Sequence, residues 1–128
     1  MHAFRAAVEA RDLDRVAELF HEDVLFHSPF AHRPFEGKDA ATAVVRAVMS
    51  VFEDFTYTDE LEGDEASGLV FRAKVDDKRL QGLDLIRTGD DGRIIEFTVM
   101  IRPANALMAV GQAMAPKVAE LPKAAAAG

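Results

Sequence analysis

The chain has 128 residues, 49% of them hydrophobic, no cysteine, and a formal net charge of −7. This length suits one domain with a real hydrophobic core, and the lack of cysteine excludes disulfides, thiolate nucleophiles and Cys-based zinc sites. The acidic balance argues against binding nucleic acid or anionic membranes. No signal peptide or stretch of roughly 18–20 apolar residues is visible, so we expect a cytoplasmic protein.

Helical spacing of apolar residues predicts two short helices at the start of the chain. The first covers residues 3–10, and the second follows Asp12 as its N-cap, with an apolar stripe of Leu13, Val16, Leu19 and Phe20. A strand over residues 24–28 ends at Pro29, and residues 28–37 form a loop with two prolines and a glycine. The longest helix is predicted over residues 39–52.

The second half of the chain shows the alternation of strands. Strands are predicted over residues 55–61, 69–75, 80–87 and 93–101, and Asp91-Gly92 marks a hairpin between the last two. Pro103 suits the start of a closing helix, and an Ala-rich tail is expected over residues 116–128. Helices followed by a run of antiparallel strands predict an α+β fold in a single domain, residues 1–115.

The last strand predicts what covers each face of the sheet. One face carries Ile95, Phe97, Val99 and Ile101, and the other carries Ile94, Glu96, Thr98 and Met100. A strand apolar on one face and half-apolar on the other is typical of a sheet covered on both sides. We expect helices and a cavity on one side and a second copy of the chain, in a homodimer, on the other. The alternative is a solvated outer face.

Asp84 is the sharpest candidate for chemistry, because it stands between apolar neighbours in Gly82-Leu-Asp-Leu-Ile86. Burying a carboxylate there is costly unless it is paired or protonated, and desolvation favours the neutral form. A neutral carboxylic acid can donate a hydrogen bond to a ligand oxygen, as in an oxyanion hole. The alternative is an edge aspartate paired with Arg72, Arg87 or Lys74.

His27, Ser28, His32 and Glu36 form a weaker candidate group. His27 and Ser28 are adjacent on a strand and therefore point to opposite faces, which argues against a Ser–His nucleophilic pair. The spacing of His27, His32 and Glu36 matches no compact metal motif. Glycine-rich phosphate loops are also missing, so we expect no metal, nucleotide or other cofactor.

These segments together resemble a known superfamily. The two opening helices, Asp23-Val-Leu-Phe-His-Ser-Pro-Phe30, Phe35-Glu-Gly37 with the helix after it, and Gly82-Leu-Asp-Leu-Ile-Arg87 resemble the nuclear transport factor 2-like superfamily, and within it the SnoaL-like group. The resemblance covers about residues 3–114. It implies a cone-shaped, curved antiparallel sheet packed on a long helix and two short N-terminal helices, with a ligand in the mouth of the cone and commonly a dimer.

The steroid isomerase branch of that superfamily resembles this chain closely at Asp84, which falls on its oxyanion-hole aspartate. Three other catalytic positions differ. The general-base aspartate falls on Ser28, and the first-helix tyrosine falls near Phe4, which cannot donate a hydrogen bond. The acid that polyketide cyclases and epoxide hydrolases place on the last strand falls near Val99.

Three functions remain open. In the first, the pocket binds a small apolar molecule with one polar oxygen, oriented by Asp84 and Ser28 between apolar walls formed by Phe26, Phe71, Phe97, Val99 and Ile101. The second is an isomerase, cyclase or lyase in which a catalytic Asp84 polarises a carbonyl and His27 or His32 is a reserve base. The third is an interaction module whose pocket is empty or small.

Overall fold

The computed structural model describes residues 1–121 and confirms the expected α+β architecture. None of its helices within that range is long and apolar enough to cross a membrane. The elements follow in the order α1 (Ala3–Glu9), α2 (Leu13–Leu19), β1 (Phe20–His27), β2 (Phe35–Glu36), α3 (Lys38–Val51), β3 (Glu53–Glu62), β4 (Ser67–Val75), β5 (Lys78–Thr88), β6 (Ile94–Arg102) and α4 (Ala104–Val118).

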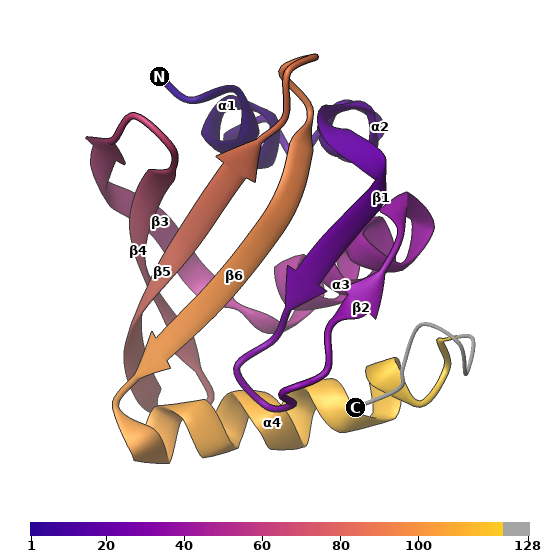
Figure 1. Ribbon diagram of the computed structural model, residues 1–128. Coiled ribbons are helices and arrows are strands. Elements are labelled where there is room, and N and C mark those ends of the chain that lie inside the picture. Colours follow the sequence, from indigo (N-terminus) through magenta and orange to yellow (C-terminus); the bar gives the residue numbers. More distant parts are fainter. Residues whose placement is uncertain (122–128) are drawn as a thin grey trace.

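All six strands form one sheet in the order β2-β1-β6-β5-β4-β3. Neighbouring strands are antiparallel except β1 and β6, which pair in parallel. The sheet curves around α3, while α1 and α2 lie near one end of the strands and α4 crosses the other (Figure 1). This is the predicted cone, with its inner face toward the helices.

The core lies between α3 and the inner face of the sheet. Helix α3 buries Ala40, Ala41, Val44 and Val45. Successive side chains of a strand point to opposite faces, so every second residue of β5 is buried, from Leu80 to Ile86. Asp84 belongs to this inward-facing set and is the one charged residue buried among residues 1–121.

Two features near the N-terminal half differ from prediction. Strand β1 begins at Phe20, which was expected in the second helix, and a register shift against β6 lies between Phe20 and Leu25. Such a bulge breaks the two-residue alternation on which the expected start at Val24 rested. Strand β2 lies within the segment predicted as loop, because a two-residue strand has no periodicity to detect.

The predicted faces of β6 are wrong at its start. Ile94 is buried and Ile95 is 41% exposed, the reverse of the alternation expected from Phe97. Arg87 pairs with Glu96 but Thr88 pairs with Ile94, so Ile95 is the extra residue of a bulge. Ile95 therefore belongs to the outer face, and Phe97, Val99 and Ile101 remain inside.

The last helix extends beyond the boundary expected at residue 115. Helix α4 runs to Val118 with Pro116 inside it, and Leu121 packs against the core. The first residues of the expected tail thus belong to the folded domain, while residues 122–128 lie outside the described range.

Gly82 shapes the inner face of the sheet. A Cβ atom at this position would lie 2.1 Å from Cζ of Phe71, whose ring therefore rests against the backbone of β5. Phe71 and Gly82 are direct cross-strand partners. Because a side chain at residue 82 would occupy the space of this ring, the glycine keeps Phe71 close to the sheet and leaves room above it.

We predict that Gly82→Ala lowers the free energy of unfolding by about 1–3 kcal/mol, as overpacking of a core does. The matched control is Gly68→Ala on the neighbouring strand, where the closest atom to a Cβ is the flexible end of Leu83 at 3.3 Å and Leu61 lies at an ordinary contact distance of 3.7 Å. Chemical denaturation followed by circular dichroism measures both variants. Equal stability losses in the two variants would contradict the role assigned to the Phe71–Gly82 contact.

Candidate functional site

A cavity of about 510 Å³ lies between the inner face of the sheet and helices α1, α3 and α4. The size lies within the range of small-molecule sites. The cavity walls include every residue that the sequence suggested for ligand binding, namely Phe26, Ser28, Phe71, Asp84, Phe97, Val99 and Ile101. The structure therefore brings these side chains to one place, and their role in binding stays a prediction.

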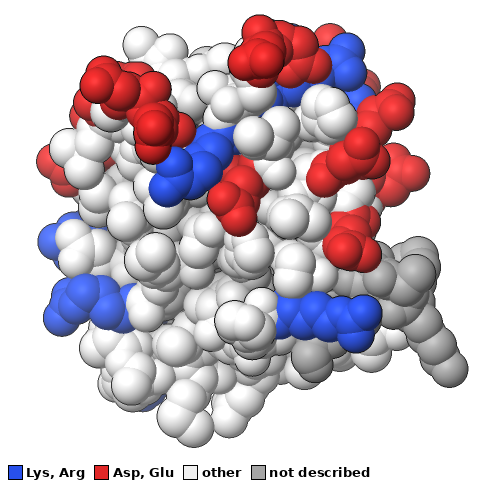
Figure 2. Space-filling model, in the orientation of Figure 1, with Lys and Arg blue, Asp and Glu red and all other residues white. Residues whose placement is uncertain are grey.

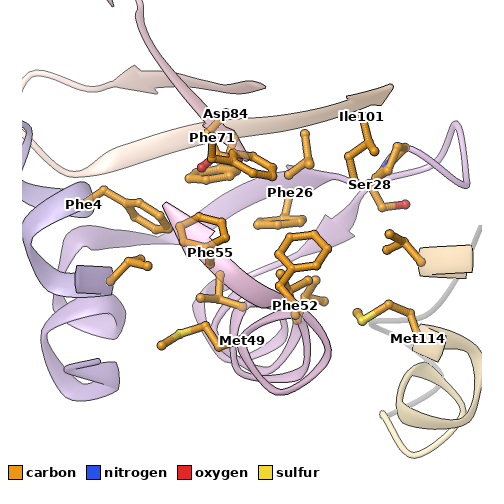
Figure 3. A pocket seen from close by; sticks show the side chains of 18 of the residues that line it. Phe4, Phe26, Ser28, Met49, Phe52, Phe55, Phe71, Asp84, Ile101 and Met114 are labelled. Carbon is orange, nitrogen blue, oxygen red and sulfur yellow. The ribbon is translucent and has the colours of Figure 1, made fainter. Parts of the chain in front are cut away.

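Two aromatic clusters form much of the wall. In the first, Phe97 contacts Phe26 in a stacked arrangement at 5.0 Å between ring centroids and Phe4 at 4.8 Å. In the second, Phe55 packs on Phe71 at 5.0 Å. Phe4 lies at one side of the hollow, and Met49 and Phe52 line its floor opposite the sheet (Figure 3). Flat aromatic walls suit a planar or ring-containing ligand.

Asp84 lies on β5 near the centre of the sheet. It pairs with Leu69 of β4 on one side and with Val99 of β6 on the other. Its carboxyl group reaches into the hollow between the aromatic clusters (Figure 3). The residue is 6% exposed, and its side chain forms no ion pair or hydrogen bond within residues 1–121; its oxygens are not fully enclosed but are accessible from the cavity. Burial raises the pKa of Asp84 to about 8. The alternative of an edge aspartate paired with arginine or lysine is wrong.

Tyr57 is a site residue that the sequence analysis missed. It lines the cavity from β3, is buried, and packs edge-on against Phe55 at 4.9 Å. Burial raises the pKa of Tyr57, and the charge of nearby Asp84 raises it further. Its phenol therefore stays protonated and can donate a hydrogen bond beside Asp84. The only sequence signal was its place among inward-facing residues of a strand, which fits a core residue equally well.

Ser28 lies at the far side of the hollow with Ile101 and Met114 (Figure 3). Its hydroxyl oxygen accepts a hydrogen bond from the backbone N–H of Phe30 at 3.3 Å, which steadies the loop after β1. The hydroxyl proton remains available to a ligand. A serine with no adjacent base is too weak to remove a proton from carbon.

The prediction of His27 or His32 as a reserve base is wrong. The Nε2 atom of His27 lies 2.9 Å from a carboxylate oxygen of Glu96 on the outer face, so the ring points away from the cavity. His27 and Ser28 do lie on opposite faces, as their adjacent strand positions predict. His32 is exposed and does not line the cavity. Within the described chain, His27, His32 and Glu36 form no metal-binding cluster.

Residues 1–97 match the SnoaL-like domain family, about three quarters of the chain. The chain belongs to the SnoaL-like domain family. Its fold is that of nuclear transport factor 2-like and cystatin-like proteins, which confirms the resemblance seen in the sequence. A comparison with curated proteins finds no match.

Solved structures similar to this SnoaL-like chain include a steroid delta-isomerase from Pseudomonas aeruginosa. It is 38% identical, with a TM-score of 0.86 over 91% of this chain and 86% of that one. An uncharacterized protein with a cystatin-like fold from Silicibacter pomeroyi is 30% identical, with a TM-score of 0.86 over 92% and 84%. A nuclear transport factor 2-like protein of unknown function from Burkholderia pseudomallei is 18% identical, with a TM-score of 0.67 over 84% and 92%, and shows the fold alone.

In this SnoaL-like pocket, two of the three positions that differ from the catalytic residues of the superfamily, Phe4 and Val99, are apolar. Phe4 is buried and packs on Phe97, so the first helix contributes no hydroxyl. Val99 lines the cavity directly beside Asp84 on the neighbouring strand. Two residues that can donate hydrogen bonds, Asp84 and Tyr57, thus line a mainly apolar cavity.

The raised pKa of Asp84 makes stability depend on pH. The folded chain keeps this proton up to about pH 8, while the unfolded chain loses it near the ordinary pKa of 3.8. The folded state therefore binds more protons between these values. The stabilising contribution is complete below about pH 4 and declines as the pH rises toward 8, by on the order of 1.4 kcal/mol per unit at most.

We predict that Asp84→Asn, which cannot ionise, becomes more stable relative to wild type as the pH rises from about 4 to 8. Urea unfolding at pH 4.5, 6 and 8 measures the difference between the two proteins, which cancels the titration of other groups. Asp59→Asn, on the exposed side of β3, is the control. A difference that does not vary with pH would show that Asp84 titrates normally.

Proposed function

We propose that this protein binds a small, mainly apolar molecule in the cone cavity and orients it through one polar oxygen. The observation that carries the proposal is the unpaired, buried carboxyl group of Asp84 facing an apolar cavity of about 510 Å³. Buried polar groups are normally hydrogen-bonded. A ligand oxygen is the partner that this group lacks within residues 1–121.

The chemistry of recognition follows from the proton on Asp84. At neutral pH the raised pKa favours the carboxylic acid, which donates a hydrogen bond, and the phenol of Tyr57 is a second donor nearby. Two donors in an apolar site select an acceptor such as a ketone, a phenol oxygen or an enolate. A hydrocarbon of the same shape leaves both donors unpaired and is bound less well.

Cavity size argues against a module that interacts through its outer face alone. A module that interacts through its outer face needs no cavity. An empty apolar cavity lowers the stability of the fold, so selection for stability alone would fill it with side chains. Here the hollow is retained together with a buried carboxyl group, which also costs stability. A bound ligand would fill the cavity and pair with the carboxyl group, which explains why both are present.

The decisive binding experiment compares Asp84→Leu with wild type, using a polycyclic ketone and the hydrocarbon of the same ring system as probes. We expect the variant to bind the ketone about tenfold more weakly, equivalent to one hydrogen bond, and the hydrocarbon equally well or better. Asp84→Asn, whose amide can still donate, falls between them. Isothermal titration calorimetry measures the affinities, and mass spectrometry of material that co-purifies with the protein identifies natural candidates.

Asp54→Asn, an exposed lining residue, controls for the loss of charge. Equal affinities of wild type and Asp84→Leu for the ketone would remove Asp84 from the site. Failure of both probes to bind wild type would overturn the proposal itself, provided that circular dichroism shows a folded protein.

A second candidate is an isomerase-like enzyme that acts on a carbonyl compound. The 38% identity to a steroid delta-isomerase and the donor pair of Asp84 and Tyr57 favour it. However, the other two carboxylates that line the cavity, Glu9 and Asp54, are exposed at its margin, whereas Asp84 is buried. A proton acceptor is therefore missing where isomerisation requires one.

Isomerisation of an unconjugated steroid ketone, followed by the ultraviolet absorbance of its conjugated product, decides between the two functions. We expect binding without turnover above the background rate. Turnover that Asp84→Leu abolishes would instead establish the enzyme and require a base among the other lining residues. Tyr57→Phe tests the second donor under the same conditions.

We also propose that the outer face of the sheet joins two copies of this chain. Leu83, Leu85, Val70 and Met100 share that face by the register of β4, β5 and β6, and Ile95 adds to it. The lower part of the surface over β5 and β6 is largely uncharged, a basic and an acidic patch lie over their upper part, and further acidic side chains lie toward the upper edges (Figure 2); Arg87 and Glu96 pair between these strands. A contiguous exposed apolar area of this kind marks an interaction site, and a twofold dimer buries it against itself.

For the homodimer, we expect Met100→Asp to shift the protein from dimer to monomer in sedimentation equilibrium. Met108→Asp on α4 is the matched control, since Met100 is 48% and Met108 66% exposed but only Met100 belongs to the outer sheet face. A monomeric wild type, or a dimer that persists in Met100→Asp, would contradict this interface.

A further inference from the structure

The charged residues that line the cavity lie at its margins, apart from Asp84. Helix α1, the turn after it and strand β3 contribute Glu9, Arg11 and Asp54, and the loop between β1 and β2 contributes Arg33. These four side chains are exposed, which marks where the cavity meets solvent. Since β3 and β2 are opposite edges of the sheet, the exposed lining residues form two groups, one by α1 and β3 and one by the β1–β2 loop, and we infer an opening of the cavity at each.

The two openings differ in charge. Two carboxylates and one guanidinium line the α1–β3 opening, and Glu9 is also near enough to Tyr57 to raise its pKa. At the opening by the β1–β2 loop, Arg33 is the one charged lining residue within residues 1–121. An anionic group is therefore disfavoured at the first opening and favoured at the second.

The surroundings of Arg33 leave its charge available. Ser28, Ala31 and Arg33 line both the cavity and a shallow groove directly outside it, where His32 and Glu96 are also present. Glu96 is engaged elsewhere, with His27 at 2.9 Å and Arg87 at 3.6 Å. Arg33 forms no ion pair in the part of the chain that the structure describes, so its guanidinium can bind an anion from a ligand.

We propose that the natural ligand is an elongated apolar acid, whose neutral oxygen meets Asp84 and Tyr57 and whose anionic end lies against Arg33 at the opening beside the β1–β2 loop. This rests on the proposed function and narrows it to one chemical class: carboxylates or similar acids that carry a second, uncharged oxygen on a ring system. One continuous cavity is lined by Asp84, Tyr57, Ser28 and Arg33. The ligand enters with its neutral end first.

The test uses two fluorescent probes that differ by one group. 1-Anilinonaphthalene-8-sulfonate is an apolar anion, and N-phenyl-1-naphthylamine is the same aromatic framework without the sulfonate. We expect Arg33→Gln to weaken binding of the sulfonate by about three- to tenfold at low salt and to leave the neutral probe within about twofold. Raising the salt concentration to about 0.5 M reduces the difference, because the rim is exposed.

Two further arginine variants locate the effect. Arg79→Gln removes an exposed charge outside the cavity, and we expect no change for either probe. Arg11→Gln removes the cation of the other opening, and a loss of sulfonate affinity there that equals or exceeds the loss in Arg33→Gln would overturn the proposal. An equal loss of both probes in Arg33→Gln would also overturn it, since the effect would then be independent of charge.

Val48→Trp fills the cavity from α3, and we expect it to abolish binding of both probes. That result would show that the probes bind inside the cavity. Met49→Phe is a milder substitute if the first variant does not fold. Probe fluorescence that survives cavity filling in a folded variant would locate the probes elsewhere and overturn the assignment. Wild type that binds neither probe refutes the proposed function as well. Wild type that binds both, with Arg33→Gln unchanged, refutes only the acidic ligand.

Discussion

The burial of one carboxyl group in an apolar hollow is the constraint around which this structure is arranged. Asp84 is held at the centre of a curved sheet, between two aromatic clusters and without a partner among residues 1–121. Desolvation keeps its proton in place up to about pH 8. A group that would ordinarily accept hydrogen bonds thereby becomes a donor. The cavity wall then carries an uncharged hydrogen-bond donor.

The backbone makes that hollow possible. Gly82 lets the ring of Phe71 lie against β5, two residues from Asp84, so the aromatic wall does not fill the space in front of the carboxyl group. Sheet curvature supplies the roof, α3 the floor and α4 a third wall (Figure 1). Each of these features costs some packing, and together they leave a volume that a small molecule can occupy.

The chain belongs to the SnoaL-like family and is similar to a steroid delta-isomerase that is 38% identical to it, yet we propose binding without turnover. Proton transfer from carbon needs an acceptor near the oxygen-binding group. Here Ser28 steadies its own loop, and His27 binds Glu96 on the outer face. The other charged lining residues are exposed at the margins of the cavity, where we propose that they select which molecules enter and in which direction.

The amino-acid sequence by itself determined the order of the elements apart from β2, and the apolar neighbours of Asp84 on its strand, because periodicity and local neighbours are short-range properties. Only the tertiary structure decided the rest. Phe20 lies in β1 and not in the second helix, and Ile95 lies on the outer face and not on the inner one. Both residues stand next to irregular pairing with β6 or β5, which depends on the partner strand. Tyr57 and Asp84 line the same cavity for a similar reason: strands that are distant along the chain come together only when the sheet closes around α3.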